Sequence, residues 1–100
     1  MTGRDQGVFA ISVAARMCST QVQNLRVYER HGLVAPGRTD GGTRLYSAAD
    51  LERVDRVRAL LADGLNLAGV ARVVALEDEV ARLRTANTSL RRRLARPAGA

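Results

Sequence analysis

The chain has 100 residues and a formal net charge of +6, which corresponds to one small domain whose positive charge favours a polyanion as partner. All 16 basic residues are arginine, which suits bidentate contacts to phosphate and guanine, although a GC-rich genome also favours arginine codons. The chain has one cysteine (Cys18), one histidine (His31) and no lysine, which excludes a disulfide within the chain and the usual catalytic and metal-binding clusters. We therefore expect no enzyme and no metal or other cofactor.

The N-terminal part leads into a short helix. Residues 1–7 are small and polar, so we expect a disordered leader there rather than a signal peptide. An apolar run follows at residues 8–11, in which Phe9 is expected to pack on the core. Ser12 offers an N-cap for a helix through about residue 18, with apolar positions at Val13, Ala14 and Met17.

A second helix is predicted directly after the first. Thr20 can cap its N-terminus, Gln23 completes a capping-box pattern, and Gly32 ends it. Its apolar face consists of Val22, Leu25 and Tyr28. The outward face has the side-chain types that contact base edges and phosphates: Gln21, Asn24, Arg26 and Arg30. Two short helices joined by a tight turn predict a helix-turn-helix, although a solvated helix can present the same polar face.

Residues 33–46 predict a β-hairpin beside that helix. Asp40-Gly41, flanked by strand-capable residues, is a hairpin signal, and Arg38 and Arg44 stand on either side of it. A hairpin in this place is a wing, whose arginines can reach the DNA backbone or the minor groove. Either arginine alone also fits a solvated hairpin, but the pair beside a helix-turn-helix favours DNA contact.

Two further helices complete the chain. Ser47 and Asp50 form a capping pattern for a helix that ends near Gly64, with apolar positions at Leu51, Val54, Val57 and Leu61. Asn66 can cap the last helix, which runs without Pro or Gly from residue 70 to about residue 94. No apolar run in the chain approaches the length of a membrane span, so we expect a soluble cytoplasmic protein.

The last helix contains a heptad repeat. Its a positions are Val73, Val80, Asn87 and Leu94, and its d positions are Leu76, Leu83 and Leu90. β-branched residues at a, leucine at d and one asparagine at a are typical of a two-stranded coiled coil. The alternative is an amphipathic helix packed on its own domain. Residues 95–100 are expected to form a frayed tail.

Residues 24–34 and 38–47 together resemble the MerR family of bacterial transcription regulators. The family pattern is Thr, a hydrophobic residue, Arg, Tyr, Tyr and Glu, then Gly-Leu, then a wing closing with Arg-x-Tyr. The chain departs from this pattern at Asn24 and at Val27, which replaces the first Tyr. It keeps the pattern at Arg26, Tyr28, Glu29, Gly32, Leu33, Arg44 and Tyr46. The resemblance covers about residues 11–76.

Within the family the chain is similar to the heat-shock repressor (HspR) subgroup, at residues 8–15, 32–39 and 64–70. The resemblance implies a homodimer, joined by an antiparallel coiled coil, on an inverted-repeat promoter site, with a DnaK-type chaperone as co-repressor. Charge leaves the orientation open. The acidic residues 77–79 and basic residues 91–93 would meet in an antiparallel pair, but parallel pairing also matches Arg72 with Glu77 and Glu79 with Arg84.

We therefore predict a mainly α fold, with a winged helix-turn-helix DNA-binding domain at residues 8–69 and a coiled-coil dimerisation helix at residues 70–94. The favoured function is a nucleoid-associated, sequence-specific repressor that binds double-stranded DNA and needs no small-molecule effector. The DNA contacts are expected from the recognition helix (Thr20, Gln21, Gln23, Asn24, Arg26, Tyr28 and Arg30) and from the wing (Arg38, Thr39, Arg44 and Tyr46). The dimer contacts are expected from Val73, Leu76, Val80, Leu83, Asn87, Leu90 and Leu94.

Two other interpretations stay open. One is a MerR-like protein-interaction adaptor that modulates a chaperone, against which the retained Arg26, Arg38, Arg44 and Tyr46 argue. The other is an excisionase-like architectural protein that bends DNA, against which the heptad repeat argues.

Overall fold

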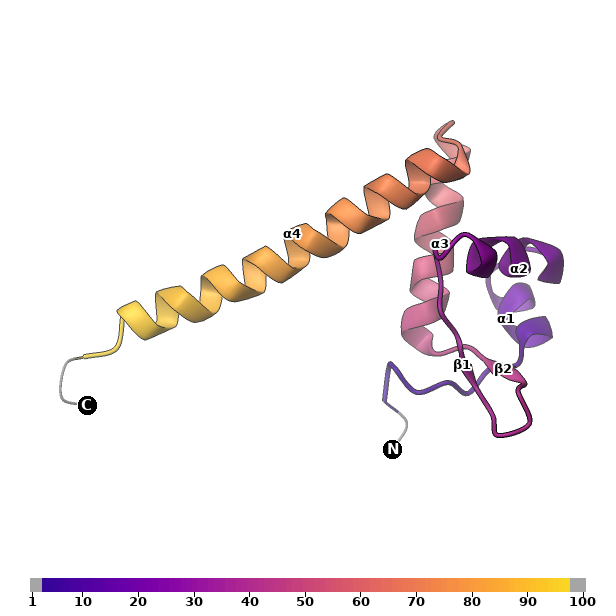
Figure 1. The fold of residues 1–100 in the computed structure, drawn as a ribbon, viewed down its shortest axis with the longest axis horizontal. Helices are drawn as coiled ribbons and strands as arrows, with labels where there is room; N and C mark the ends of the chain where they lie inside the picture. The colour runs from indigo at the N-terminus through magenta and orange to yellow at the C-terminus, as the bar shows by residue number, and fades with distance from the viewer. Residues whose placement is uncertain (1–2, 98–100) are drawn as a thin grey trace.

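The computed structural model describes residues 3–97. Its helices are α1 (Ile11–Met17), α2 (Val22–Arg30), α3 (Ala48–Ala62) and α4 (Leu67–Leu94), and a two-stranded sheet of β1 (Gly37–Arg38) and β2 (Arg44–Leu45) lies between α2 and α3 in the chain. The first three helices and the sheet form a compact head, from which α4 projects (Figure 1). The predicted mainly α fold, with a helix-turn-helix, a wing and a long C-terminal helix, is confirmed.

The turn between α1 and α2 differs from the predicted one. Ser19 has a left-handed backbone (φ 54°), and the N–H of Thr20 donates to the Ala15 carbonyl at 2.9 Å. Because the chain is still turning at Thr20, the N-cap position of α2 falls on Gln21, whose side chain makes no capping hydrogen bond. The capping box of Thr20 and Gln23 is therefore wrong. The predicted Ser12 cap is wrong too, since α1 begins at Ile11 after Ala10.

Gly32 ends α2 as predicted. Its φ of 72° lies in the left-handed region, which glycine adopts without a steric cost. The following N–H, of Leu33, donates back to the Tyr28 carbonyl at 2.9 Å and closes the last turn. The chain then enters the core, because Leu33 and Val34 are both buried.

The wing is a short antiparallel hairpin in which Arg38 pairs with Arg44. Asp40 and Gly41 occupy the centre of its turn, as the N–H of Gly42 donates to the Thr39 carbonyl at 2.9 Å. Gly42 then takes the left-handed conformation (φ 85°). The hairpin predicted from Asp40-Gly41 therefore forms. Phe9 extends it by bridging to Tyr46 in antiparallel fashion.

Part of the predicted leader contacts α3 in the described residues. The Ala49 N–H donates to the Arg4 carbonyl at 3.0 Å, and the Arg4 side chain pairs with Glu52 at 2.7 Å. These contacts join Arg4 to the first turns of α3. Residues 1 and 2, the beginning of the predicted leader, and residues 98–100, the end of the predicted tail, lie outside the described residues.

Both predicted helix caps after the wing are present. The Ser47 hydroxyl accepts from the Asp50 N–H at 3.0 Å, and the Asp50 carboxylate accepts from the Ser47 N–H at 2.9 Å. The Asn66 side chain accepts from the Gly69 N–H at 2.8 Å. In α3 the core contacts come from Val54, Val57 and Leu60, while the predicted Leu51 and Leu61 are half-buried.

The first turns of α4 belong to the head. Val70 and Val74 are buried in the same core as Leu25 and Tyr46, so the head continues past the predicted boundary at residue 69. Two ion pairs join α3 to α4, Arg53–Asp78 and Arg56–Glu77, both at 2.6 Å. The rest of α4 extends away from the head and ends at Leu94 (Figure 1). No helix in the described part of the chain is long and apolar enough to cross a membrane.

Candidate nucleic-acid interface

The outward face of α2 is polar and exposed. Leu25 and Tyr28 are buried, which fixes the rotation of the helix about its axis. The exposed side chains on the remaining surface are Gln21, Gln23, Asn24, Arg26 and Arg30. Side chains of these types can donate to and accept from base edges, and the arginines can also bind phosphate.

Thr20 orients Asn24 instead of capping the helix. The Asn24 Nδ2 donates to the Thr20 Oγ1 at 2.9 Å, and Thr20 is half-buried. A side-chain amide has two N–H donors and a carbonyl acceptor, so this bond leaves Asn24 one donor and its acceptor for a base. The pair therefore presents Asn24 at the N-terminal end of α2 in a fixed direction.

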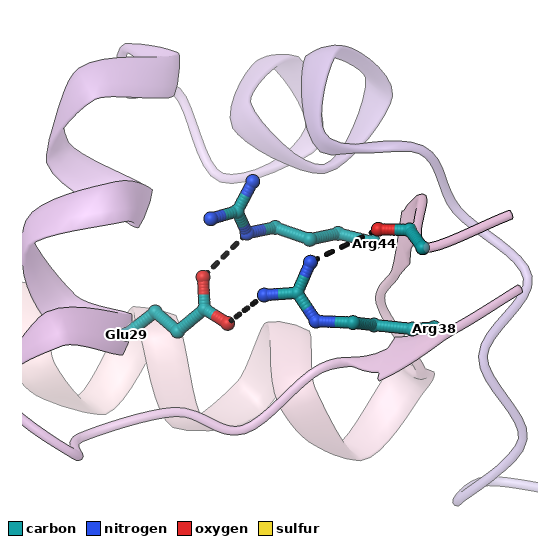
Figure 2. A network of polar contacts seen from close by, with 4 residues as sticks. Glu29, Arg38 and Arg44 are labelled. Atoms are coloured by element: carbon teal, nitrogen blue, oxygen red, sulfur yellow. Dashed lines mark hydrogen bonds and ion pairs between the residues drawn. The ribbon is translucent and has the colours of Figure 1, made fainter.

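The wing arginines are tied to α2 through Glu29 (Figure 2). The Glu29 Oε1 accepts from the Nε of Arg44, and its Oε2 accepts from the Nη2 of Arg38 at 2.9 Å. Arg38 also donates from Nη1 to the Gly42 carbonyl at 3.0 Å. One carboxylate thus joins the recognition helix to both strands of the wing, and the two elements present their arginines together.

A cleft of about 530 Å³ lies between α2 and the wing, lined by Gln23, Arg26, Glu29, Arg30 and Arg44. Three of these five residues are arginines, and the charge of the single carboxylate is shared with Arg38. The cleft is therefore positively charged, open to solvent and suited to an anion.

Two tyrosines predicted to contact DNA lie in the core instead. Tyr46 is fully buried, and Tyr28 is 6% exposed. Burial is also the main cause that raises the pKa of both phenols above the ordinary value. Their side chains have almost no surface to offer a ligand, so we remove both from the set of DNA contacts. Thr39 remains at the exposed wing tip, where its hydroxyl accepts from the Thr43 N–H at 3.1 Å.

The projecting part of α4 carries an exposed apolar stripe. Five of the predicted dimer contacts, Leu76, Val80, Leu83, Leu90 and Leu94, are between 44% and 87% exposed. Asn87 is exposed as well, and Val73 is half-buried at the edge of the head. The acidic block predicted to face Arg91–Arg93 is partly used within the chain, since Glu77 and Asp78 pair with α3.

The family model for MerR helix-turn-helix regulatory proteins matches residues 9–77, which is more than half of the chain. The chain belongs to the MerR family. Its relatives include the HTH-type transcriptional regulator GlnR from Bacillus anthracis, which is 33% identical over 75 residues, 75% of this chain and 58% of that protein.

Among curated relatives, a putative heat shock protein HspR from Streptomyces coelicolor is 49% identical over 80 residues, which is 79% of this chain and 53% of that protein. This MerR-family chain spans about half the length of the curated relatives it matches first. Among solved structures, the fold is similar to that of PbrR691 from Ralstonia metallidurans CH34 in complex with lead(II). The match covers 84% of this chain and 78% of PbrR691, with a TM-score of 0.67 and 26% identity. HiNmlR, a MerR family regulator lacking the sensor domain and bound to promoter DNA, matches 86% of this chain and 77% of its own, with a TM-score of 0.61 and 20% identity.

Glu29 is the site residue that sequence reasoning missed in this MerR-family chain. It matches the family pattern, but the sequence alone assigns it no role. The available signal was one acid between Arg26 and Arg30, on a helix whose other polar residues are neutral or basic. Its partners, Arg38 and Arg44, lie in a separate element, so spacing along the sequence does not reveal the contact.

Cys18 has a structural place in the head. It is buried, its thiol lies 3.8 Å from the Leu51 carbonyl oxygen, and its own carbonyl accepts from the Arg58 guanidinium. Burial raises the pKa of the thiol to about 11. Among residues 3–97, no three His, Cys, Asp or Glu side chains gather where they could hold a metal ion.

Proposed function

We propose that the chain is a sequence-specific, double-stranded-DNA-binding repressor that acts as a homodimer on an inverted-repeat promoter site. The observation that carries this proposal is the exposed polar face of α2 beside a wing whose two arginines are fixed to the same helix. The promoter-DNA complex named for HiNmlR, which has the same fold, supports DNA as the ligand. Such a regulator works at the nucleoid, in the cytoplasm.

We assign different DNA contacts to different parts of α2 and to the wing: some side chains contact base edges, and others bind phosphate. Gln23 and Asn24 lie in the first turn of α2, with Gln21 at its N-cap, where recognition helices contact base edges in the major groove. We assign phosphate contacts to Arg26, Arg30 and the wing arginines. Phosphate contacts position the protein on the duplex without reading its sequence. Asn24→Ala should therefore relax the preference at particular base pairs, and Arg44→Ala should weaken binding to every duplex.

The exposed stripe of α4 supports a second copy of this chain as its occupant. Isolated exposed leucines are ordinary, but a continuous seam at heptad spacing on a projecting helix needs a partner helix. In an antiparallel pair with its twofold axis beside Thr85, every large apolar side chain from Leu76 onward is covered. The layers are Leu76 with Leu94, Val80 with Leu90, and Leu83 with Asn87. Glu79 then faces Arg93 at the edge of the seam, and two heads related by this axis require an inverted-repeat site.

We propose repression and a DnaK-type co-repressor from the resemblance to the heat-shock repressor subgroup, and the similarity to the HspR relative supports membership of that subgroup. A gel shift with and without a purified DnaK-type chaperone tests the second point. Tighter or supershifted binding in its presence is the expected result.

Selection of bound duplexes from a random-sequence library tests the main proposal. We expect enriched duplexes with two inverted half-sites, bound on the order of a thousandfold more tightly than scrambled DNA, and a dimer in sedimentation. No enrichment would favour the adaptor interpretation. Enrichment of bent DNA without twofold symmetry by a monomer would favour the architectural one.

A further inference from the structure

One acid lies in the positively charged cleft between α2 and the wing. Glu29 lines this cleft together with Arg26, Arg30 and Arg44. A carboxylate at a surface that binds a polyanion repels phosphate, so by charge alone it should weaken binding. The position of Glu29 therefore needs a physical explanation.

Both carboxylate oxygens of Glu29 are occupied by wing arginines. Oε1 accepts from Arg44 Nε, and Oε2 accepts from Arg38 Nη2 at 2.9 Å. The side chain of Glu29 is 21% exposed, so the pairing is screened less than an ion pair in open solvent. Two cations balance one anion, and the cleft keeps its positive charge.

The two arginines are held by different atoms. Arg38 uses both of its Nη atoms, one on Glu29 and the other on the Gly42 carbonyl, so it fastens the wing tip to the helix. Arg44 is held through Nε, and within residues 3–97 its two Nη atoms make no hydrogen bond. In Figure 2 the contact with Glu29 runs from Nε, and no dashed line reaches the two terminal nitrogens. Arg44 is thus fixed at its inner edge and presents its outer N–H edge.

We propose that Glu29 is a positioning residue for DNA binding, which aims the free edge of Arg44 at a backbone phosphate seated in the cleft with Arg26 and Arg30. An unrestrained arginine must give up rotamer freedom to make such a contact, whereas one fixed through Nε has already done so. The inference rests on the proposed function, because it needs DNA at this face. It adds the phosphodiester group as the ligand of the cleft and a role for the acid beside it.

The test compares two variants that change the charge equally. Glu29→Gln removes the carboxylate from the cleft, and the control, Glu52→Gln, removes one from an exposed pair with Arg4 outside it. Each variant is titrated with a duplex selected by the wild-type chain and with a random duplex of equal length, over a range of salt. Charge alone predicts tighter binding for both variants.

Positioning predicts the opposite result for Glu29→Gln. We expect this variant to bind both duplexes about tenfold more weakly than the wild type, with a salt slope reduced by about one unit per protomer. The control should bind as tightly as the wild type or more tightly. In an Arg44→Ala background, Glu29→Gln should cause no further loss, because the residue it positions is absent.

The inference is overturned if Glu29→Gln behaves like Glu52→Gln, or if its loss persists undiminished in the Arg44→Ala background. Should Glu29→Gln fail to fold, Glu29→Asp provides the same test, since it keeps the charge but is too short to reach both arginines. Weaker binding is again expected, and unchanged binding overturns the inference. A wild-type chain that binds neither duplex contradicts the proposed function itself.

Discussion

Tyr46 shows how a single residue can match a family pattern for a structural reason. It is fully buried, and its hydroxyl has no hydrogen-bond partner among the described residues. A buried hydroxyl without a partner is unfavourable, so Tyr46→Phe should keep the packing and raise the free energy of unfolding by up to about 1–2 kcal/mol. Urea denaturation measures this change. A gel shift should show unchanged DNA affinity, and a clear loss would restore Tyr46 as a DNA contact.

Cys18 predicts a pH dependence of stability. Its thiol pKa is raised from the ordinary 9.0 to about 11 in the folded chain, chiefly by burial, with a contribution from Asp55. The folded state therefore favours the neutral thiol, while the unfolded chain loses that proton near pH 9. The stabilisation is complete below pH 9 and is lost as the pH rises toward 11, by about 2–3 kcal/mol in all.

The measurement is urea denaturation of the wild type and Cys18→Ala at pH 8 and pH 10.5. The wild type should lose more stability over this interval than the variant. Tyr28 and Tyr46, whose pKa values are also raised, act equally in both proteins and cancel in the comparison. Equal losses would show that the thiol titrates normally.

At the scale of elements, the helix caps could be predicted where the residues that form the cap are close together in the sequence. The capping box at Ser47 and the cap at Asn66 need only residues three apart, and both form. The cap expected at Thr20 fails because the turn, with Ser19 in a left-handed conformation, moves the start of α2 to Val22. The cap expected at Ser12 fails because α1 already begins at Ile11.

Contacts between elements could not be predicted from the sequence. Glu29 reaches wing residues nine and fifteen positions away, and Arg4 reaches Glu52 on α3. Nothing in the sequence around Arg4 indicates this contact, because its partner lies in another element. The elements that form the candidate site, α2 and the wing, could be predicted; the bond that joins them could not.

The junction of α3 and α4 allows a prediction at the scale of elements. Val70 is fully buried, while the ion pair between Arg56 and Glu77 lies near the surface. Val70→Ala should therefore lower the free energy of unfolding by about 2 kcal/mol, from lost burial plus the cavity left behind. Arg56→Ala, the control, should leave the urea midpoint nearly unchanged, because exposed ion pairs contribute little. A larger effect of Arg56→Ala would mean that charge, not packing, fixes α4 to the head.

At the scale of the whole molecule, the head and the projecting helix have different partners. The head presents a positively charged face with α2 and the wing, and α4 extends from it with a separate apolar stripe (Figure 1). A helix of 28 residues is about 42 Å long, and most of that length lies beyond Val74, the last buried residue. The separation of the two heads on DNA would then be set by where the twofold axis crosses α4.

The proposed register allows a charge-pair test of that axis. Leu76 faces Leu94 of the second copy when the helices are antiparallel about Thr85, whereas parallel helices pair each residue with itself. Leu76→Glu alone should give monomers in sedimentation, because it places a charge in the seam. Combining it with Leu94→Arg should restore the dimer in the antiparallel register, where Glu faces Arg at both ends. In a parallel pair the same two changes would place Glu against Glu and Arg against Arg, so the double variant would stay monomeric.

The matched control combines Leu76→Glu with Leu90→Arg. Residue 90 faces Val80 in this register, so this control should not restore dimers. A dimer from that control, and none from the Leu94 variant, would move the axis away from Thr85.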